Sequence, residues 1–264
     1  MQPITVYRID PKTRLFMYPE SVLPDPDGEY LVPGNCVLVA PPQAGENERA
    51  RWGDELPLLD PNFGRPGTSA WQIIGDYREA DLYLTSDGSK YEIDQDVDGQ
   101  AYDGIGPLPS WLTLSERPSK YHHWASGTWV LNEQEELAAL IAEKVSELSR
   151  ECQAQIYAGF ASSALGEEHH YPALATDQQN LTASVLDSTV PGLPEGWQTP
   201  FWCSLGGVWD FRMHSAEQIQ RVGRDAKLVI LACMAHNAAL ASAARSAQNK
   251  TALESIVWTA PEIA

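Results

Sequence analysis

The sequence predicts an α+β protein with a β-rich amino-terminal half, a long connecting helix, and a carboxy-terminal α+β module of short hairpins and long helices. Two patterns predict this class. Up to residue 131, short apolar runs alternate with Asp-Gly and Pro-rich turns, which is typical of short strands. From residue 132, apolar side chains recur at helical spacing in two long stretches separated by hairpin patterns. A chain of 264 residues suits one large domain or two medium ones.

Residues 1–66 read as a β-rich segment that ends in a loop or linker. We expect strands at Ile4–Tyr7, Arg14–Tyr18 and Cys36–Ala40, separated by turns rich in Asp, Pro and Gly. From Pro41 to Gly67 the chain is polar and interrupted by Pro and Gly. This stretch is therefore predicted to be a long surface loop or a linker between two β-rich pieces.

Residues 67–131 read as a second β-rich unit. The expected strands are Ile73–Ile74, Leu82–Leu84, Tyr91–Ile93 and Trp129–Leu131. The sequence Ser86-Asp-Gly-Ser89 provides a tight turn between two of them.

Residues 132–158 are expected to form the connecting helix. Asn132 is the expected N-cap, and the acidic first turn suits the positive end of the helix dipole. Apolar residues recur at helical spacing until Gly159 stops the helix. We expect this helix either to bridge the two halves or to pack against a second copy in a homo-oligomer.

Residues 159–264 are expected to form the carboxy-terminal module, which opens with two hairpins. The first joins Phe160–Leu165 to His169–Ala173, and the second joins Phe201–Leu205 to Val208–Arg212. The second turns on Gly206-Gly207, a pair that supplies the positive φ angles of a two-residue turn.

Three helices complete the predicted module. Thr176 or Asp177 caps a helix that runs to Asp187. Ser215-Ala-Glu-Gln218 is a capping box at the start of the longest helix. One face of that helix carries Ile219, Val222, Ala226, Val229, Cys233, His236 and Leu240. A short helix is expected near 252–256.

The composition excludes several classes of partner. The formal net charge is −18, with 10 Lys/Arg against 20 Asp/Glu in residues 1–130 and 8 against 16 in residues 131–264. An acidic surface on both halves disfavours nucleic acid and anionic membranes. We also expect no signal peptide and no bilayer-spanning run, since the most apolar stretch, Leu228–Cys233, is short. The four widely spaced cysteines predict free, buried thiols in a reducing compartment.

A calcium site is the one metal candidate in the sequence. Asp94, Asp96 and Asp98 alternate before Gly99, as in the first half of a calcium-binding loop. Position twelve is Ile105, where such a loop needs Glu, so a solvated acidic loop is the favoured interpretation. The neighbouring pairs His122-His123 and His169-His170 point to opposite faces of a strand, and Cys233 with His236 lacks further ligands. We therefore expect neither a metal nor a cofactor.

Catalytic motifs are not evident. Ser163, Ser204 and His214 could be grouped on paper, but no Gly-x-Ser-x-Gly motif supports them. The glycines lie in turns rather than between a strand and a helix, which argues against phosphate binding. We expect that the protein is not an enzyme.

Aromatic residues are the remaining signal. Nine tryptophans are present, and one short segment concentrates aromatic side chains at Trp197, Phe201, Trp202, Trp209 and Phe211. One interpretation places these side chains in a core made of small β-layers. The other makes some of them anchors for a protein partner, because Trp and Tyr dominate interface hot spots. We take these five residues as the candidate partner-binding set.

Two series of residues carry a family resemblance. The first is Trp71, Asp76-Tyr-Arg78, Tyr83, Asp87-Gly88 and Trp124-x-x-Gly127-x-Trp129-Val130. The second is Ala158-Gly-Phe160, Tyr171, Asp177, Trp202, the Ser215–Asn249 helix and Ile256-Val-Trp258. Together they resemble phage tail-fibre assembly proteins, chaperones encoded beside tail-fibre genes in phages and phage-tail-like bacteriocins. The resemblance covers roughly residues 70–260.

The sequence departs from this family at two turns. Gly206-Gly207 stands where the family usually has Asp-Asn, and Trp124-Ala-Ser-Gly127 stands in place of Trp-Asp-Gly. Both sequences still form turns, so the departures put in doubt a polar contact there rather than the fold.

The resemblance implies a function and a location. Members of this family bind the carboxy-terminal end of a fibre polypeptide and help it fold and trimerise, and some stay on the mature tip. By this resemblance, the partner is the carboxy-terminal region of a trimeric tail fibre, met in the cytoplasm of the bacterial host. The alternatives are a structural or receptor-binding component retained at the fibre tip, or a carbohydrate-binding module that uses the aromatic residues.

Overall fold

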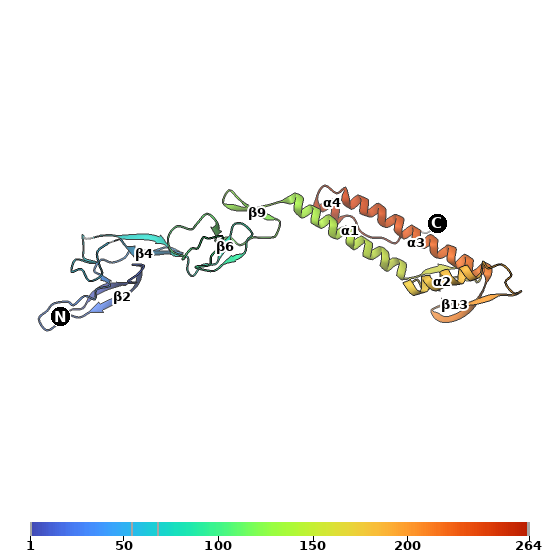
Figure 1. The fold of residues 1–264 in the computed structure, drawn as a ribbon, viewed down its shortest axis with the longest axis horizontal. Coiled ribbons are helices and arrows are strands. Elements are labelled where there is room, and N and C mark those ends of the chain that lie inside the picture. The colour runs from blue at the N-terminus through green and yellow to red at the C-terminus, as the bar shows by residue number, and fades with distance from the viewer. Residues whose placement is uncertain (1, 54, 68, 263–264) are drawn as a thin grey trace. The chain divides into compact units, whose positions relative to one another are not determined.

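The computed structural model describes residues 2–53, 55–67 and 69–262 of the chain and divides it into two compact units. Unit 1 comprises residues 1–132 and contains strands β1 to β10, whereas unit 2 comprises residues 133–264 and contains helices α1 to α4 with strands β11 to β14 (Figure 1). This arrangement confirms the predicted α+β class, with strands first and long helices in the second half.

The described residues of unit 1 form four small antiparallel sheets, with strand orders β2-β1-β3, β4-β5, β7-β6-β8 and β10-β9. Its strands are β1 (Ile4–Ile9), β2 (Phe16–Val22), β3 (Cys36–Val37), β4 (Glu48–Trp52), β5 (Trp71–Gly75), β6 (Leu82–Leu84), β7 (Lys90–Tyr91), β8 (Leu112–Thr113), β9 (His122–Ala125) and β10 (Thr128–Leu131). The turn at Ser86–Ser89 joins β6 to β7, which pair antiparallel as the sequence predicts.

Strand β4 overturns the prediction of a loop or linker over Pro41–Gly67. It pairs with β5 across the expected boundary at residue 66, up to Trp52 opposite Trp71. Trp52 is fully buried in a core cluster with Ile9, Val37 and Phe63. The sequence does not indicate this strand clearly. Its alternation of exposed and buried side chains is only five residues long, its exposed side carries charged residues, and its flanks are rich in Pro and Gly.

A second core in unit 1 lies under β6, β7 and β8. Its buried members are Leu82, Leu84, Tyr91, Tyr102 and Leu112. The backbone N–H of Tyr102 donates to the hydroxyl of Tyr91 over 2.7 Å, so a buried phenol satisfies a loop backbone group that lacks a strand partner. The loop around residue 102 is thereby attached to the small sheet.

In unit 2, the chain described up to residue 262 forms one four-stranded antiparallel sheet, in the order β11-β12-β13-β14, and four helices. The elements are α1 (Glu133–Tyr157), β11 (Phe160–Ser162), β12 (His169–Tyr171), α2 (Ala175–Asp187), β13 (Gln198–Leu205), β14 (Val208–Ser215), α3 (Ala216–Arg245) and α4 (Lys250–Glu254). Both predicted hairpins are confirmed. Gly206 and Gly207 have φ angles of 57° and 84°, as a two-residue turn requires.

The helix boundaries follow the expected caps with two shifts. At α3, Gln218 N–H donates to Ser215 Oγ over 3.3 Å and Ser215 N–H donates to Gln218 Oε1 over 2.8 Å, which confirms the capping box. At α2, Asp177 is the third helical residue and accepts from the N–H of Leu174, the N-cap, so neither Thr176 nor Asp177 begins the helix. Helix α4 begins two residues earlier than expected.

Helix α1 packs along α3 within unit 2 (Figure 1). Leu148 of α1, Ala244 of α3 and Leu253 of α4 form the buried centre of this contact. The apolar face of α1 is therefore covered by the same chain, and α1 is part of unit 2 rather than a separate connector.

Helix α3 is the one helix in the described part of the chain that is long and apolar enough to cross a membrane, with a mean hydropathy of 1.4 over its most apolar window. The sequence-based expectation that no stretch qualifies is wrong by this measure. A core helix of a soluble protein passes the same test, and residues of α3 such as Ile219, Val222 and Cys233 are buried in unit 2. Composition alone therefore does not assign α3 to a membrane.

Candidate partner-binding site

The sheet of unit 2 has one covered face and one open face. Successive side chains of β13 and β14 alternate between these faces, and the register places Trp202 opposite Phe211. On the covered face, Phe201, Cys203 and His214 are fully buried and pack in the core against α3. The open face carries the side chains of the intervening residues.

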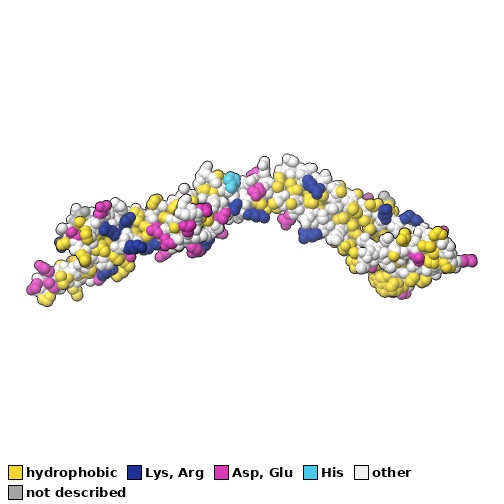
Figure 2. All heavy atoms as spheres, in the orientation of Figure 1, with side chains coloured by type: hydrophobic (Ala, Val, Ile, Leu, Met, Phe, Trp, Pro, Cys, Tyr) yellow, Lys and Arg dark blue, Asp and Glu magenta, His cyan; other side chains and the backbone are white. Residues whose placement is uncertain are grey.

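We call the open side of the β13–β14 hairpin the aromatic face, formed by Pro200, Trp202, Trp209, Phe211 and Met213. Trp202, Trp209, Phe211 and Met213 are 39%, 40%, 63% and 50% exposed. The ring centroids of Trp202 and Phe211 lie 4.9 Å apart, and those of Trp202 and Trp209 lie 6.2 Å apart with a 15° angle between the ring planes. Hydrophobic side chains gather at this hairpin in Figure 2. Large apolar side chains grouped on an exposed surface mark interaction sites.

The structure divides the five aromatic residues that the sequence singled out. It brings Trp202, Trp209 and Phe211 together on the aromatic face. Phe201, at 1% exposure, points into the core, and half-buried Trp197 packs against the same core, so both have structural positions. The sequence reasoning missed Met213, although its spacing of two from Phe211 and four from Trp209 was the signal that would have found it.

A buried polar network holds the covered face in place. The hydroxyl of Tyr171 on β12 lies 2.9 Å from Nε2 of His214 on β14, and Nδ1 of His214 donates to the backbone carbonyl of Arg212 over 2.8 Å. Burial raises the pKa of Tyr171 and lowers the pKa of His214, so both groups are neutral near pH 7. This network connects two strands behind the aromatic face and favours a fixed sheet geometry.

Ser204 and His214, two of the residues considered as a catalytic group, do not converge. Register places Ser204 opposite Trp209, on the open side of the sheet, whereas His214 points into the core. His214 is also held by Tyr171 and the Arg212 carbonyl, which leaves the imidazole without a free nitrogen to serve as a base.

The calcium candidate does not form a site either. Asp96 accepts a hydrogen bond from the N–H of Gly99 over 3.0 Å and so closes a turn, while Asp94 and Asp98 adopt positive φ angles. Among the described residues, no group of three or more His, Cys, Asp or Glu side chains could hold a metal ion. The alternating carboxylates belong to a tight turn, and their side chains do not meet at a common point.

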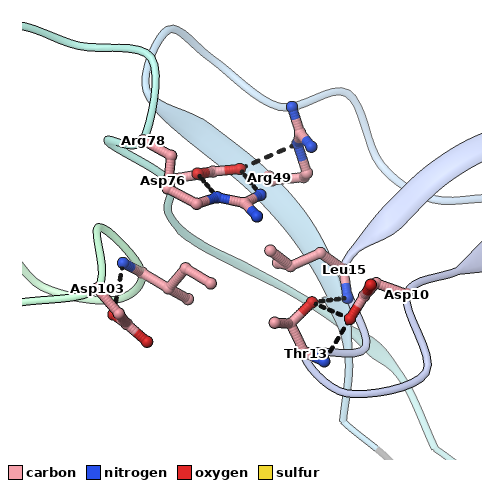
Figure 3. A network of polar contacts seen from close by, with 8 residues as sticks. Asp10, Thr13, Leu15, Arg49, Asp76, Arg78 and Asp103 are labelled. Carbon is pink, nitrogen blue, oxygen red and sulfur yellow. Dashed lines mark hydrogen bonds and ion pairs between the residues drawn. The ribbon is translucent and has the colours of Figure 1, made fainter. Parts of the chain in front are cut away.

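An ion-paired network lies in the Asp76-Tyr-Arg78 segment of unit 1 (Figure 3). The guanidinium of Arg78 donates to both oxygens of Asp76 over 2.7 Å, and Arg49 of β4 approaches the same carboxylate to 3.1 Å. The hydrogen bonds from Arg78 hold the pKa of Asp76 below its usual value. Backbone bonds join Asp76 to Asn47 and Tyr77 to Gly104, so this segment ties β4 to the following loop.

An apolar groove of about 710 Å³ lies between α2 and α3. Its walls include Leu181, Val185, Leu186, Ala226, Ile230 and Leu231, and Arg224 and Lys227 contribute basic groups. The sequence reasoning did not anticipate this groove, because its two sides are 40 residues or more apart in places and meet only through helix packing.

Comparison with known proteins concerns mainly unit 2. The family described as a domain of unknown function (DUF4376) matches residues 139–260, the part of the chain that carries the aromatic face. No curated protein and no solved structure matches the chain. Unit 2 is therefore similar to a domain family to which no activity is attached.

Proposed function

We propose that this protein is a tail-fibre assembly chaperone, which binds the carboxy-terminal end of a phage or phage-tail-like bacteriocin fibre and promotes its folding and trimerisation. The observation that carries the proposal is the aromatic face, with Trp202, Trp209 and Phe211 grouped and exposed on one hairpin. The order of motifs that resembles tail-fibre assembly proteins supplies the class of partner.

The physical requirements of such a chaperone suit this surface. An unassembled trimer subunit exposes apolar surface and unpaired strand edges, which aggregate unless they are covered. A protein that covers them needs an apolar contact area in a fixed geometry within a soluble exterior. The hairpin provides the contact area, the buried Tyr171–His214 bond stiffens its support, and the net charge of −18 provides solubility.

The direct test is co-expression of the chain with the carboxy-terminal fragment of a tail-fibre polypeptide from the same genome, followed by size exclusion with light scattering. We expect the fibre fragment to be insoluble when expressed alone, and soluble and trimeric when co-expressed with this protein. The mass of the complex then states whether the protein stays bound. A fragment that trimerises equally well alone would contradict the assembly role, and recovery of the protein in purified particles would favour a component retained at the fibre tip.

Matched variants connect the test to the aromatic face. Met213→Ala should weaken fibre binding, whereas Met17→Ala should not, although both methionines are 50% exposed on strands. Met17 lies on β2 of unit 1, outside the stretch that resembles the chaperone family. Equal effects of the two substitutions would remove the aromatic face from the proposal.

Carbohydrate binding is the second candidate, because Trp202 and Trp209 present nearly parallel indole rings. Aligned aromatic rings provide apolar platforms, and a sugar ring has apolar C–H faces that can lie on them. A glycan array probed with the full chain would separate the candidates. Binding that is lost in Trp209→Ala in the absence of any fibre polypeptide would favour the carbohydrate reading.

A further inference from the structure

Strand β14 is an open edge of the sheet in unit 2. The strand order β11-β12-β13-β14 leaves β14 with β13 as its one strand neighbour among the described residues. All eight residues of β14 pair with β13 without a register shift. Edge strands expose a row of backbone donors and acceptors on which a further strand can pair.

The other edges in the described sheets are shorter or protected. Strand β2 contains Pro19 and Glu20, and its pairing with β1 has a register shift. Strands β3, β7 and β8 have two residues each, and β11 has three. Strand β14 is the longest of these edges and contains no proline. Its charged residues, Asp210 and Arg212, lie on the side opposite Trp209, Phe211 and Met213, so its open side presents apolar side chains of the kind that proteins normally avoid at a free edge. This edge is therefore equipped for strand addition.

The pairing register identifies which backbone groups of β14 face outward. The two-residue turn makes Leu205 and Val208 a hydrogen-bonded pair, and such pairs alternate with non-hydrogen-bonded pairs along an antiparallel ladder. The backbone groups of Asp210 and Arg212 therefore point toward β13. Those of Trp209, Phe211 and Met213 point away from it.

Two further observations agree with this register. Pro200, opposite Met213, has no N–H to donate to β14, as its place in a non-hydrogen-bonded pair allows. The N–H of Ser215 bonds to Gln218 Oε1 and so lies outside the β13–β14 ladder. The residues whose side chains build the aromatic face are thus the residues whose backbone groups are free at the edge.

We propose that β14 receives an extended segment of the fibre polypeptide as a fifth strand of the sheet, an inference that rests on the proposed chaperone function. The added strand satisfies the outward backbone groups of Trp209, Phe211 and Met213. Its alternate apolar side chains extend the aromatic face. The other side of β14 carries Asp210 and Arg212, so the intervening positions of the incoming segment are polar.

A foreign strand suits this edge better than a second copy of the chain. Residues 133–264 carry 8 Lys/Arg against 16 Asp/Glu, a net charge of −8, so two copies of unit 2 repel one another. A fibre segment whose polar residues are uncharged or basic meets no such repulsion. Its recognition depends on backbone hydrogen bonds and on side chains at every second position.

The test is amide hydrogen exchange, followed residue by residue in the full chain with and without the carboxy-terminal fibre fragment. In the free protein, the amides of Asp210 and Arg212 should exchange slowly and those of Trp209, Phe211 and Met213 rapidly. Binding of the fragment should slow the second group at least tenfold. The alternation within one strand distinguishes strand addition from side-chain contact alone.

Two substitutions of Phe211 provide an independent test of strand addition. Phe211→Ala removes the ring, and Phe211→Pro removes the ring together with the outward N–H. Because proline is tolerated where the N–H faces away from the sheet, the hairpin should survive, as circular dichroism would verify. We expect Phe211→Pro to bind the fragment roughly 5- to 10-fold more weakly than Phe211→Ala, the effect of one lost hydrogen bond with local misfit.

Each outcome decides the inference. Fragment binding without new protection at residues 209, 211 and 213 overturns strand addition and leaves the chaperone function standing. Protection that rises with protein concentration in the absence of fibre identifies a second copy as the occupant and also overturns it. If the fragment does not bind at all, the chaperone function fails and strand addition fails with it. If Phe211→Pro does not fold, the exchange measurement on the unaltered chain decides.

Discussion

Tyr171 donates its phenolic proton to Nε2 of His214 over 2.9 Å, and both side chains are fully buried in unit 2. Burial lowers the pKa of His214, so the imidazole is neutral near pH 7. In the neutral ring Nδ1 donates to the carbonyl oxygen of Arg212, and Nε2 is left as the acceptor for the Tyr171 hydroxyl. One bond thus couples β12 to β14 and fixes the protonation state of a histidine beneath the aromatic face.

This bond predicts a pH-dependent stability. Burial lowers the pKa of His214 below its ordinary value of 6.5, so the unfolded chain binds the proton more readily. Stability is complete above pH 6.5 and falls as the pH drops from 6.5 toward the folded pKa. The free energy of unfolding should decrease by about 1.4 kcal/mol for each pH unit in that window. Urea unfolding of unit 2 between pH 8 and pH 5 measures this slope.

Two substitutions serve as controls for the pH effect. His214→Gln should lower stability at pH 8 and remove most of the slope. His123→Gln, at an exposed histidine of unit 1, should leave the slope unchanged. A slope that persists in His214→Gln would assign the pH dependence to another group.

Substitutions on the two faces of the β13–β14 hairpin should have different effects: on the covered face they should lower stability, and on the aromatic face they should weaken fibre binding. Phe201→Ala should destabilise unit 2 by about 3–5 kcal/mol, because it leaves a cavity in the core. Trp209→Ala should change the melting temperature little and should cost about 2 kcal/mol or more in fibre binding. Trp197→Ala should affect stability before binding, since Trp197 packs against the core. Thermal melting and binding titrations of the three variants check the assignment, which a collapse of Trp209→Ala would contradict.

The pairing of β4 with β5 predicts that unit 1 depends on β4 for its stability. Trp52 is fully buried and meets Trp71 edge to face, with ring centroids 5.3 Å apart. Trp52→Ala should lower the stability of unit 1 by about 3–5 kcal/mol. If Trp52 lay in a linker instead of a strand, the same substitution would change the stability of unit 1 little. Leu59→Ala, at an 89% exposed residue of the same stretch, is the matched control and should melt like the unaltered protein.

The Asp76 network predicts a second pH effect of the usual acid type. Asp76→Asn should destabilise unit 1 by about 1–3 kcal/mol at pH 7, because two guanidinium groups lose their charged acceptor. The folded pKa of Asp76 is lowered, so the stabilisation is present above the unfolded pKa near 4 and is lost as the pH falls. The stability difference between the two proteins should therefore shrink from pH 7 to pH 3. A constant difference would mean that the ion pairs contribute little.

The position of Gly159, just after α1, should tolerate no side chain. Its φ angle is 96°, and an added Cβ would collide with the carbonyl oxygen of Tyr171. Gly159→Ala should therefore cost about 2–3 kcal/mol, from positive φ and collision together. Gly166 has a similar φ of 98° with open space around it. Gly166→Ala should cost about 1 kcal/mol, the price of the backbone angle alone. Equal melting temperatures for the two variants would exclude the collision.

The local signals in the sequence predicted most elements of unit 2. Gly206-Gly207 predicted the turn of the second hairpin, and the Ser215–Gln218 box predicted the start of α3. The apolar spacing from Ile219 to Cys233 identified the buried stripe of that helix. These features depend on neighbours within a few residues along the chain, so the sequence specifies them without knowledge of distant contacts.

The candidate site was predicted only in part. The sequence located the aromatic segment but did not separate Phe201 from Trp202, because both strands carry apolar residues on both faces. It missed β4, whose partner lies beyond a stretch of turns, and the groove between α2 and α3. The pairing of β4 with β5 and the packing of α2 against α3 depend on residues far apart in the chain. A short alternating pattern does not indicate which distant strand or helix it will contact.

The sequence by itself determined the fold class, the two hairpins of unit 2, the cap of α3 and the acidic surface. Turn chemistry and helical periodicity act between near neighbours in the chain, and net charge is a sum over residues, so none of them needs a distant contact. Only the tertiary structure decided which side of the β13–β14 hairpin is exposed. The core formed with α3 covers the side of Phe201 and His214, and this leaves Trp202, Trp209 and Phe211 at the surface. Alternation defines two faces of a strand, and burial against a distant helix selects between them.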